Sequence, residues 1–338
     1  MTLHTMFTDN MVLQANKPIR VFGTGKGKAR LCFLGKTYQS QAKGEKWEVL
    51  LPPMPYGGPY EMQIFLEGEE KRLRNVMIGE VILCAGQSNM QFTVGEEQTT
   101  EPFCYITSPA IRTYVQERIG AYEGLKSKNG WVACTEQTLP HFSAIGYHLA
   151  RILHQNTGVA VGIIGCYQGA SIIESWIEES LISQPEFYVP KEKRRFNEKH
   201  PMYQEYGIWN VYGKLYRETF SKILPYTVGS IVWYQGESNT SLAESEMYPR
   251  WLKLLADSWR RDLCDPSLPF VIMQIADMDG MGEEWTMLQE AQEKAVSLIA
   301  NAHLVVTKDV SESTNIHPAD KRKVSERVYN VLFEGEKT

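Results

Sequence analysis

The segment Glu80-Val81-Ile82-Leu83-Cys84 runs directly into the segment Ala85-Gly86-Gln87-Ser88-Asn89-Met90-Gln91-Phe92. The first segment is mostly apolar and predicts a buried strand, whereas the polar residues of the second are typical of the turn that follows a strand. Open α/β sheets carry their reactive groups at the carboxyl edge of the strands. A serine at that edge can present its hydroxyl group, and the next helix offers backbone N–H donors. Ser88 is therefore a candidate nucleophile, although most serines in such places are turn or N-cap residues.

Strands and helices alternate from about residue 76 onward. Residues 143–157 and 284–300 carry apolar side chains three or four positions apart, which predicts amphipathic helices. This alternation predicts an α/β fold with a parallel sheet that is covered by helices on both faces. The long connections at residues 91–142 and 185–208 are expected to shape a binding site above the sheet. The apolar runs that predict strands are residues 79–85, 111–116, 159–167, 229–235, 270–276 and 303–309.

The first 75 residues follow a different pattern. Short apolar segments alternate there with glycine-containing turns, and no helical periodicity is present. This pattern predicts a small β-sandwich-like domain at residues 1–75, followed by a larger domain at residues 76–338. The strand candidates of the small domain are residues 18–23, 29–35, 47–51 and 60–66.

Composition excludes several classes of protein. The chain has 338 residues, of which 43% are hydrophobic and 22% charged, so it can bury a large core. The net charge of −5 and the lack of a Lys/Arg stripe argue against a nucleic-acid partner. No apolar stretch approaches the roughly 20 residues of a membrane span, so no membrane insertion is expected. The six cysteines form no Cys-x-x-Cys pair and no phosphate-binding loop is present, so no disulfide, metal site or cofactor is expected.

The compartment and the oligomeric state stay open at this point. The first residues lack a charged segment followed by an apolar core, so no signal peptide is visible. A soluble protein is expected in either case. It would be cytoplasmic as the sequence stands, or periplasmic or secreted if a leader has been removed.

Three further segments could join Ser88 in one site. Residues 161–170 and residues 230–239 each read as a strand that ends in a polar turn. His317 stands much later in the chain, just ahead of a final helix. Acyl transfer needs a nucleophile, a base and N–H donors aimed at the developing oxyanion. Together these segments contain the whole set.

The same segments resemble the signature blocks of a known family. They are Gly79-Glu80-Val81 with Gly86-Gln87-Ser88-Asn89-Met90, Trp233-Tyr234-Gln235-Gly236-Glu237-Ser238-Asn239, and Ile316-His317-Pro318. The blocks are similar to those of the sialate O-acetylesterase family, within the SGNH-hydrolase superfamily of carbohydrate esterases. The long block that begins at Trp233 is the most specific, and further matches extend the resemblance nearly end to end. It implies a three-layer α/β/α SGNH-hydrolase domain with a flavodoxin-like parallel sheet, preceded by the small all-β domain.

The resemblance also implies roles for individual residues. Ser88 would be the nucleophile and His317 its general base. The backbone N–H groups of Ser88 and Gly169 would bind the oxyanion. The family usually has two glycines at the second position, whereas this chain has Gly169-Ala170. Only the backbone of Gly169 is needed for this role.

Amide and acidic side chains would complete the site. The third oxyanion donor would be the side-chain amide of either Gln235 or Asn239, and the sequence leaves both open. Gln87 would support the nucleophile from the neighbouring position. Glu237 would either hold its own turn or orient His317.

The acid that normally completes such a triad is missing from its expected place. Many relatives carry Asp-Ile-His-Pro, whereas this chain has Asn315-Ile316-His317-Pro318. Either the site uses a Ser-His dyad in which Asn315 or a nearby carbonyl orients the histidine, or Glu312 folds back as the acid. We favour the dyad. Loss of the acid lowers the rate of such a site but leaves the nucleophile, base and oxyanion donors in place.

The resemblance implies a serine esterase that removes acetyl groups from carbohydrate through an acetyl-Ser88 intermediate. The expected partner is an O-acetylated sugar or glycan, and O-acetylated sialic acid is the expected substrate. Acetylxylan or another acetylated glycan is an alternative. The changed acid position leaves a catalytically weak glycan-binding homologue as a second alternative.

Overall fold

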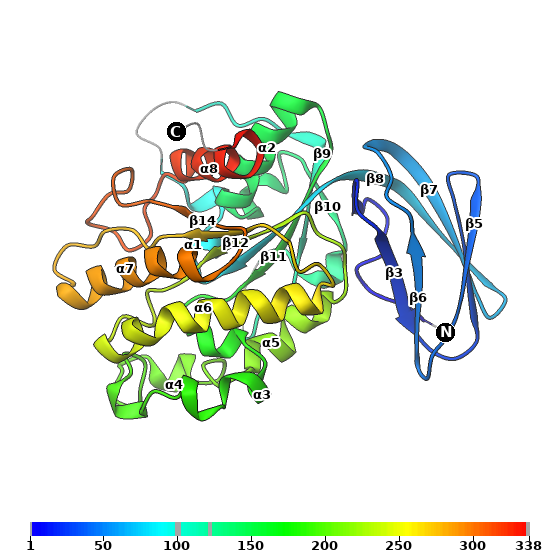
Figure 1. Cartoon of the computed structure of the whole chain (residues 1–338). Helices are drawn as coiled ribbons and strands as arrows, with labels where there is room; N and C mark the ends of the chain where they lie inside the picture. Colours follow the sequence, from blue (N-terminus) through cyan, green and yellow to red (C-terminus); the bar gives the residue numbers. More distant parts are fainter. Residues whose placement is uncertain (1, 99–102, 121–123, 336–338) are drawn as a thin grey trace.

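The computed structural model describes residues 2–98, 103–120 and 124–335, so the expected connection at residues 91–142 lies partly outside the described residues. Within these ranges a mixed sheet of 11 strands crosses the molecule, and helices lie against it (Figure 1). Its main path has the strand order β10-β9-β11-β8-β12-β13-β14. The bounds of these strands are β8 Glu69–Gly86, β9 Ser108–Val115, β10 Val132–Cys134, β11 Val161–Tyr167, β12 Ser230–Tyr234, β13 Phe270–Met273 and β14 Ala302–Val305.

Neighbouring strands of this path run parallel from β9 to β14, and they are the strands that the apolar runs predict. Strand β10 at the edge pairs antiparallel with β9, so the sheet as a whole is mixed rather than purely parallel. The register places Gly86 at the end of β8 opposite both Tyr167 of β11 and Tyr234 of β12. Three strands therefore end side by side, and the loops that follow them share one edge.

Alternate residues of the central strands pack into two separate hydrophobic cores. Leu83 of β8 belongs to the core that contains Trp251 of α6, whereas Ile82 and Cys84 belong to the core that contains Ile145 of α2. A strand that is buried on both faces is a continuous apolar run in sequence. Helices α6 and α7 cover one face, and α2 and α8 cover the other (Figure 1). The bounds are α2 Ala144–Thr157, α6 Leu242–Asp262, α7 Glu283–Leu298 and α8 Arg322–Tyr329.

The amino-terminal part consists of strands, as its sequence predicts, and it is joined to the larger part by β8. The first half of β8 pairs antiparallel with β7, and the second half pairs parallel with β11 and β12. The expected boundary after residue 75 lies within this strand. The division into two domains stays a prediction. The remaining strands are β1 Thr2–Leu3, β2 Val12–Gln14, β3 Ile19–Thr24, β4 Lys28–Phe33, β5 Lys36–Gln41, β6 Lys46–Leu51 and β7 Gly57–Leu66.

Short helical turns build the loops above and beside the sheet. They include α1 Ser88–Gln91, η1 Val94–Glu96, η2 Ser127–Asn129, η3 Leu139–His141, η4 Ile173–Trp176, α3 Glu179–Ile182, η5 Pro185–Phe187, η6 Lys191–Lys193, α4 Tyr203–Tyr206, α5 Lys214–Glu218, η7 Phe220–Ile223 and η8 Asn330–Glu334. Among the helices that the structure describes, none has the length and apolar character needed to cross a bilayer.

Candidate active site

The close approach of three strand ends places Ser88 at the edge of the sheet. Gly86 ends β8 with φ of 138°, and a Cβ at this position would lie 2.1 Å from the Tyr234 carbonyl oxygen. Only glycine fits this contact without strain. The Gln87 N–H donates to the Tyr234 carbonyl at 2.9 Å, and the Gln168 N–H donates to the Gly86 carbonyl at 3.0 Å. Ser88 follows at once as the first residue of α1.

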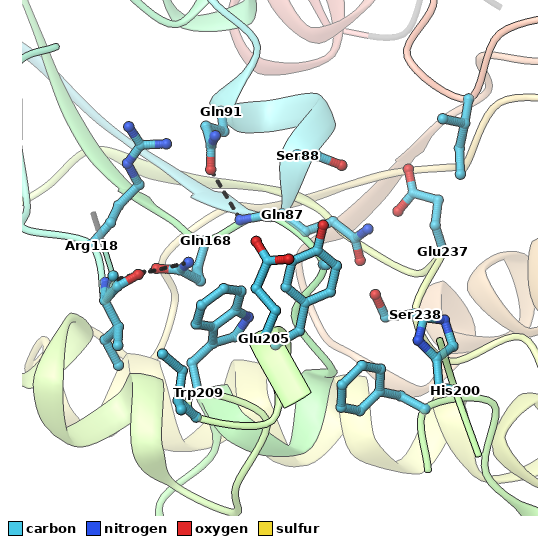
Figure 2. A pocket seen from close by; sticks show the side chains of 18 of the residues that line it. Gln87, Ser88, Gln91, Arg118, Gln168, His200, Glu205, Trp209, Glu237 and Ser238 are labelled. Carbon is cyan, nitrogen blue, oxygen red and sulfur yellow. Dashed lines mark hydrogen bonds between the residues drawn. The ribbon is translucent and has the colours of Figure 1, made fainter. Parts of the chain in front are cut away.

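A pocket of about 660 Å³ opens above this edge, and Figure 2 shows the side chains that surround it. Five of the sequence-predicted site residues line it, which are Gln87, Ser88, Gly169, Glu237 and His317. The nucleophile and base candidates thus come together from opposite ends of the larger part of the chain. In Figure 2 the Ser88 hydroxyl is directed toward the side of the pocket that carries Glu237.

Ser88 and His317 share the pocket without a direct hydrogen bond between their side chains among the contacts of the described residues. Ser88 is half-buried, and the ring centroids of His317 and Phe92 lie 6.5 Å apart. Burial lowers the pKa of His317, and the nearby Lys321 ammonium lowers it further, whereas Glu96 acts in the opposite direction. Catalytic hydrogen bonds are often long in ligand-free sites and tighten when substrate binds. A neutral imidazole that lines the same pocket as a serine hydroxyl is suited to accept its proton.

Neither candidate for the missing acid contacts the His317 ring. The Asn315 side-chain oxygen accepts from the backbone N–H of His317 at 2.9 Å. One carboxylate oxygen of Glu312 accepts from the backbone N–H of Ala319 at 2.7 Å. Both residues therefore hold the conformation of the loop around His317 rather than the imidazole itself. Within the described residues, no side-chain carboxylate is hydrogen-bonded to that ring.

The two amide candidates for the oxyanion hole do not line the pocket. Gln235 and Asn239 have no exposed surface. The Gln235 amide nitrogen donates to the Ser171 carbonyl and to the Asn239 side-chain oxygen, both at 2.9 Å. The Asn239 amide nitrogen donates to Glu174 at 2.9 Å and to Glu244 at 3.2 Å. Because these amide hydrogens are used inside the protein, the geometry does not support either side chain as an oxyanion donor.

The Gly169 N–H reaches the pocket, but a side chain already occupies it. The Gln91 side-chain oxygen accepts from this N–H at 3.0 Å (Figure 2). A Cβ at Gly169 would lie 3.8 Å from the Ser88 Cβ, so the glycine backbone is next to the candidate nucleophile. Ala170 follows in a left-handed conformation with φ of 50°. The Asn210 side chain holds this turn, because its nitrogen donates to the Ala170 carbonyl and its oxygen accepts from the Ile172 N–H. Gln91 has to release this N–H before an oxyanion can use it.

Two further polar residues at the site were not predicted from the sequence. Asn89 and Lys321 are both buried, and the Lys321 ammonium donates to the Asn89 side-chain oxygen at 2.7 Å. Asn89 also donates to Glu237 at 2.6 Å. Asn89 is adjacent to Ser88, and Lys321 comes four positions after His317, so proximity in sequence was the available signal. Lysines are mostly exposed in proteins, so nothing in the sequence predicts that this one is buried.

The far wall of the pocket is polar and aromatic. Arg118, Arg195, His200, Glu205 and Trp209 all line it. Burial and the Arg195 charge both lower the pKa of His200. Side chains that combine hydrogen-bonding groups with a flat apolar ring are suited to a sugar, which offers hydroxyl groups and C–H faces. Among the described residues, no cluster of three or more His, Cys, Asp or Glu side chains has the arrangement of a metal site.

Comparison with solved structures agrees with this fold. A carbohydrate acetylesterase from Xanthomonas citri superposes with a TM-score of 0.82 and 25% identity, and the match covers 100% of this chain and 76% of that one. Its similarity therefore extends over the amino-terminal strands as well as the large sheet.

Known sequences point to the same group. Sialate O-acetylesterase of Homo sapiens is 25% identical over 349 residues, which cover 89% of this chain and 64% of the human protein. The protein of the same name from Mus musculus is 23% identical, over 84% of this chain and 62% of its own length. The chain thus spans less than two thirds of the length of these relatives. Residues 78–326, well over half of the chain, match the family described as carbohydrate esterase, sialic acid-specific acetylesterase, and the chain belongs to that family.

Proposed function

We propose that this chain is a serine esterase that removes O-acetyl groups from carbohydrate through an acetyl-Ser88 intermediate. The observation that carries the proposal is the meeting of Ser88 and His317 in one pocket, at the edge where three strands end. Membership of a carbohydrate esterase family supports the same reaction. The finer fold class that we propose is the three-layer SGNH-hydrolase arrangement, with the amino-terminal strands as a separate small domain.

The proposed reaction begins with proton transfer from the Ser88 hydroxyl to His317 as the serine oxygen attacks the acetyl carbonyl carbon. The carbonyl oxygen becomes an oxyanion, which the backbone N–H groups of Ser88 and Gly169 would stabilise once Gln91 has moved aside. The tetrahedral intermediate then expels the sugar oxygen, which takes the proton from His317. Water, deprotonated by His317, attacks the acetyl-serine, and acetate leaves as Ser88 regains its proton.

We infer that this site works as a Ser-His dyad. Asn315 and Glu312 both bond to the backbone of the His317 loop, which leaves the imidazole without a carboxylate partner in the described contacts. Glu312→Gln should therefore change kcat less than about threefold, because a glutamine oxygen can still accept from the Ala319 N–H. A loss of about 10³-fold or more in kcat would instead make Glu312 the triad acid.

O-acetylated sialic acid is the substrate that we propose. The family description supports it, and the guanidinium groups of Arg118 and Arg195, which line the pocket together with the carboxylates of Glu205 and Glu237, are suited to bind the carboxylate of an anionic sugar. Acetylated xylan, which carries no carboxylate on its main chain, is the alternative.

The test is the release of acetate from O-acetylated sialic acids and from acetylated xylan, measured at equal enzyme concentration. We expect the sialic acids to be hydrolysed with the higher kcat/KM. Preference for xylan would contradict the sialic-acid assignment but keep the esterase. Binding to either glycan with no acetate release, and no hydrolysis of p-nitrophenyl acetate, would make the chain a glycan-binding homologue.

A further inference from the structure

A buried cation lies between the elements that carry the candidate nucleophile and base. Lys321 precedes α8, and only 1% of its surface is exposed. Its ammonium lies 4.9 Å from the centroid of the Phe92 ring and 5.9 Å from that of the Tyr234 ring. The Lys321 ammonium donates to the Asn89 side-chain oxygen at 2.7 Å, which is a short, charge-assisted hydrogen bond. The Lys321 ammonium is thus hydrogen-bonded to a side chain of α1, the helix that begins with Ser88.

Asn89 links three segments through one fully buried amide group. Its oxygen accepts from Lys321, and its nitrogen donates to a Glu237 carboxylate oxygen at 2.6 Å and to the Ile316 carbonyl at 2.9 Å. A primary amide has two N–H groups, so both are used. Ile316 immediately precedes His317. The single side chain next to Ser88 therefore ties the helix of the nucleophile to the loop of the base.

Glu237 supplies the opposite charge. Its side chain lies at the pocket wall, 5% of the residue is exposed, and burial raises the pKa of its carboxyl group. One of its oxygens accepts from Asn89, and its second oxygen has no hydrogen-bond partner among the described residues. A buried carboxylate without a compensating cation is costly. Asn89 bonds to both Glu237 and Lys321, and the Lys321 charge opposes the rise in the Glu237 pKa.

Several charged groups face the Lys321 ammonium from the surrounding loops. Burial lowers the pKa of Lys321 to about 7, and four carboxylates oppose that effect. Glu237 has the largest influence on the pKa of Lys321. The other three carboxylates are Glu97, which follows η1, and Glu312 and Asp320, which belong to the loop around His317. The Lys321 charge in turn lowers the pKa of His317.

We propose that Lys321 and Asn89 are positioning residues, which hold the Ser88 helix, the Glu237 turn and the His317 loop in one fixed arrangement. This inference rests on the proposed esterase function. Neither residue lines the pocket, so neither is assigned contact with substrate. A displacement of about 1 Å between reacting groups can cost about 10²-fold in rate, so a small loosening of this unit should be visible in kcat.

The test compares Lys321→Met with Lys17→Met. Lys17 serves as the control because its ammonium, like that of Lys321, donates to a side-chain oxygen, that of Asp265 at 2.8 Å, and because it does not line the pocket. Lys321→Met should lower kcat by about tenfold or more, with a much smaller change in KM. Lys17→Met should leave both constants unchanged per folded molecule.

The pH profile separates positioning from mere stabilisation. The free base is His317, so kcat/KM falls as pH drops through its pKa. Since burial and then the Lys321 cation lower that pKa, Lys321→Met should move the acid limb to higher pH, whereas Lys321→Arg should leave it near its original place. Asn89→Ser keeps the Lys321 cation but removes the amide that joins Lys321, Glu237 and the Ile316 carbonyl. It should therefore lower kcat without shifting the pH of the acid limb. It also carries the test if Lys321→Met does not fold.

Thermal unfolding provides a readout that does not depend on activity. In a double-mutant cycle of Lys321→Met and Glu237→Gln, the double variant should be more stable than the sum of the single effects predicts, because the unpaired buried carboxylate is gone. Additive effects, or a Lys321→Met variant with the kcat and acid limb of the Lys17→Met control, would overturn the inference. If the effects of Lys321→Met and Glu237→Gln on stability are coupled but the protein hydrolyses no acetyl ester, the proposed function is wrong and the structural link between the two residues stands.

Discussion

The two halves of strand β8 show how one continuous strand serves two environments. From Glu69 to Arg72 every residue is exposed, whereas from Ile78 to Gly86 every residue is buried. Between them Asn75 adopts φ of 56°, and the buried guanidinium of Arg112 bonds both its carbonyl and its side chain. The first half forms the edge of a solvated sheet, and the second half is packed on both faces and ends at the site. Tolerance to substitution should therefore change sharply along this strand.

The largest effect is expected immediately beyond the buried half. Ser88→Ala removes the proposed nucleophile and should lower kcat by about 10⁴-fold or more on any acetyl ester. The half-buried hydroxyl contributes little packing, so the melting temperature should change little. Steady-state kinetics and thermal unfolding of one preparation measure both quantities. Residual activity above a few per cent of the wild type, with contamination excluded, would rule out Ser88 as the nucleophile.

His317→Asn tests the partner that only the fold brings to this strand end. Removal of the base should lower kcat by about 10³-fold, since the serine stays protonated. In the wild-type protein burial holds the pKa of His317 below 6.5, so activity should persist into mildly acidic solution and fall as pH drops further. A loss confined to KM would make His317 a substrate-binding residue. An acid limb above pH 6.5 would contradict the burial of the imidazole.

Glycines at the two ends of β8 give a direct comparison of stability. Gly86→Ala places a Cβ 2.1 Å from the Tyr234 carbonyl oxygen at a φ of 138°, so it should destabilise the fold by about 3 kcal/mol or more. Gly68→Ala has a φ of 87° but meets nothing within 4 Å, so only the backbone cost of roughly 1–2 kcal/mol is expected. Urea unfolding of both variants measures the difference. Equal losses would show that the strand ends are not in close contact.

The smallest effect is expected in the exposed half. Arg72 pairs with Glu70 at 3.0 Å and with Glu61 at 3.3 Å on the surface. Such exposed pairs are screened by water and salt. Arg72→Ala should leave the melting temperature and kcat within the error of their measurement. A clear loss of kcat would mean that the amino-terminal sheet takes part in the reaction rather than acting as a scaffold.

The same contrast explains which elements could be predicted. Apolar runs such as residues 79–85 and 159–167 predicted the central strands, because a strand that is buried on both faces consists almost entirely of apolar residues. Strand β5 was missed, since Lys36–Gln41 is polar and none of its residues is fully buried. Its pairing with β4 depends on backbone hydrogen bonds, which do not require a particular pattern of polar and apolar side chains in the sequence.

Within the site, the sequence identified Ser88, Gly169 and His317 as pocket residues, but it could not orient the amides. Gln235 and Asn239 follow a strand in the same way as Ser88 does, and nothing local distinguishes an amide that faces the pocket from one that faces inward. Their hydrogen-bond partners come from remote segments, such as Ser171 and Glu174. Burial of these polar atoms would destabilise the fold unless such partners were present to form hydrogen bonds with them.

The sequence by itself determined the alternation of strands and helices, the strand-end position of the serine, and the family. These features depend on local periodicity and on contiguous motifs. Only the tertiary structure decided that Gln91 occupies the Gly169 N–H, that Asn315 and Glu312 bond to backbone, and that Lys321 lies buried against Asn89. The physical reason is that hydrogen bonding and burial depend on which groups the fold brings within about 3 Å of one another.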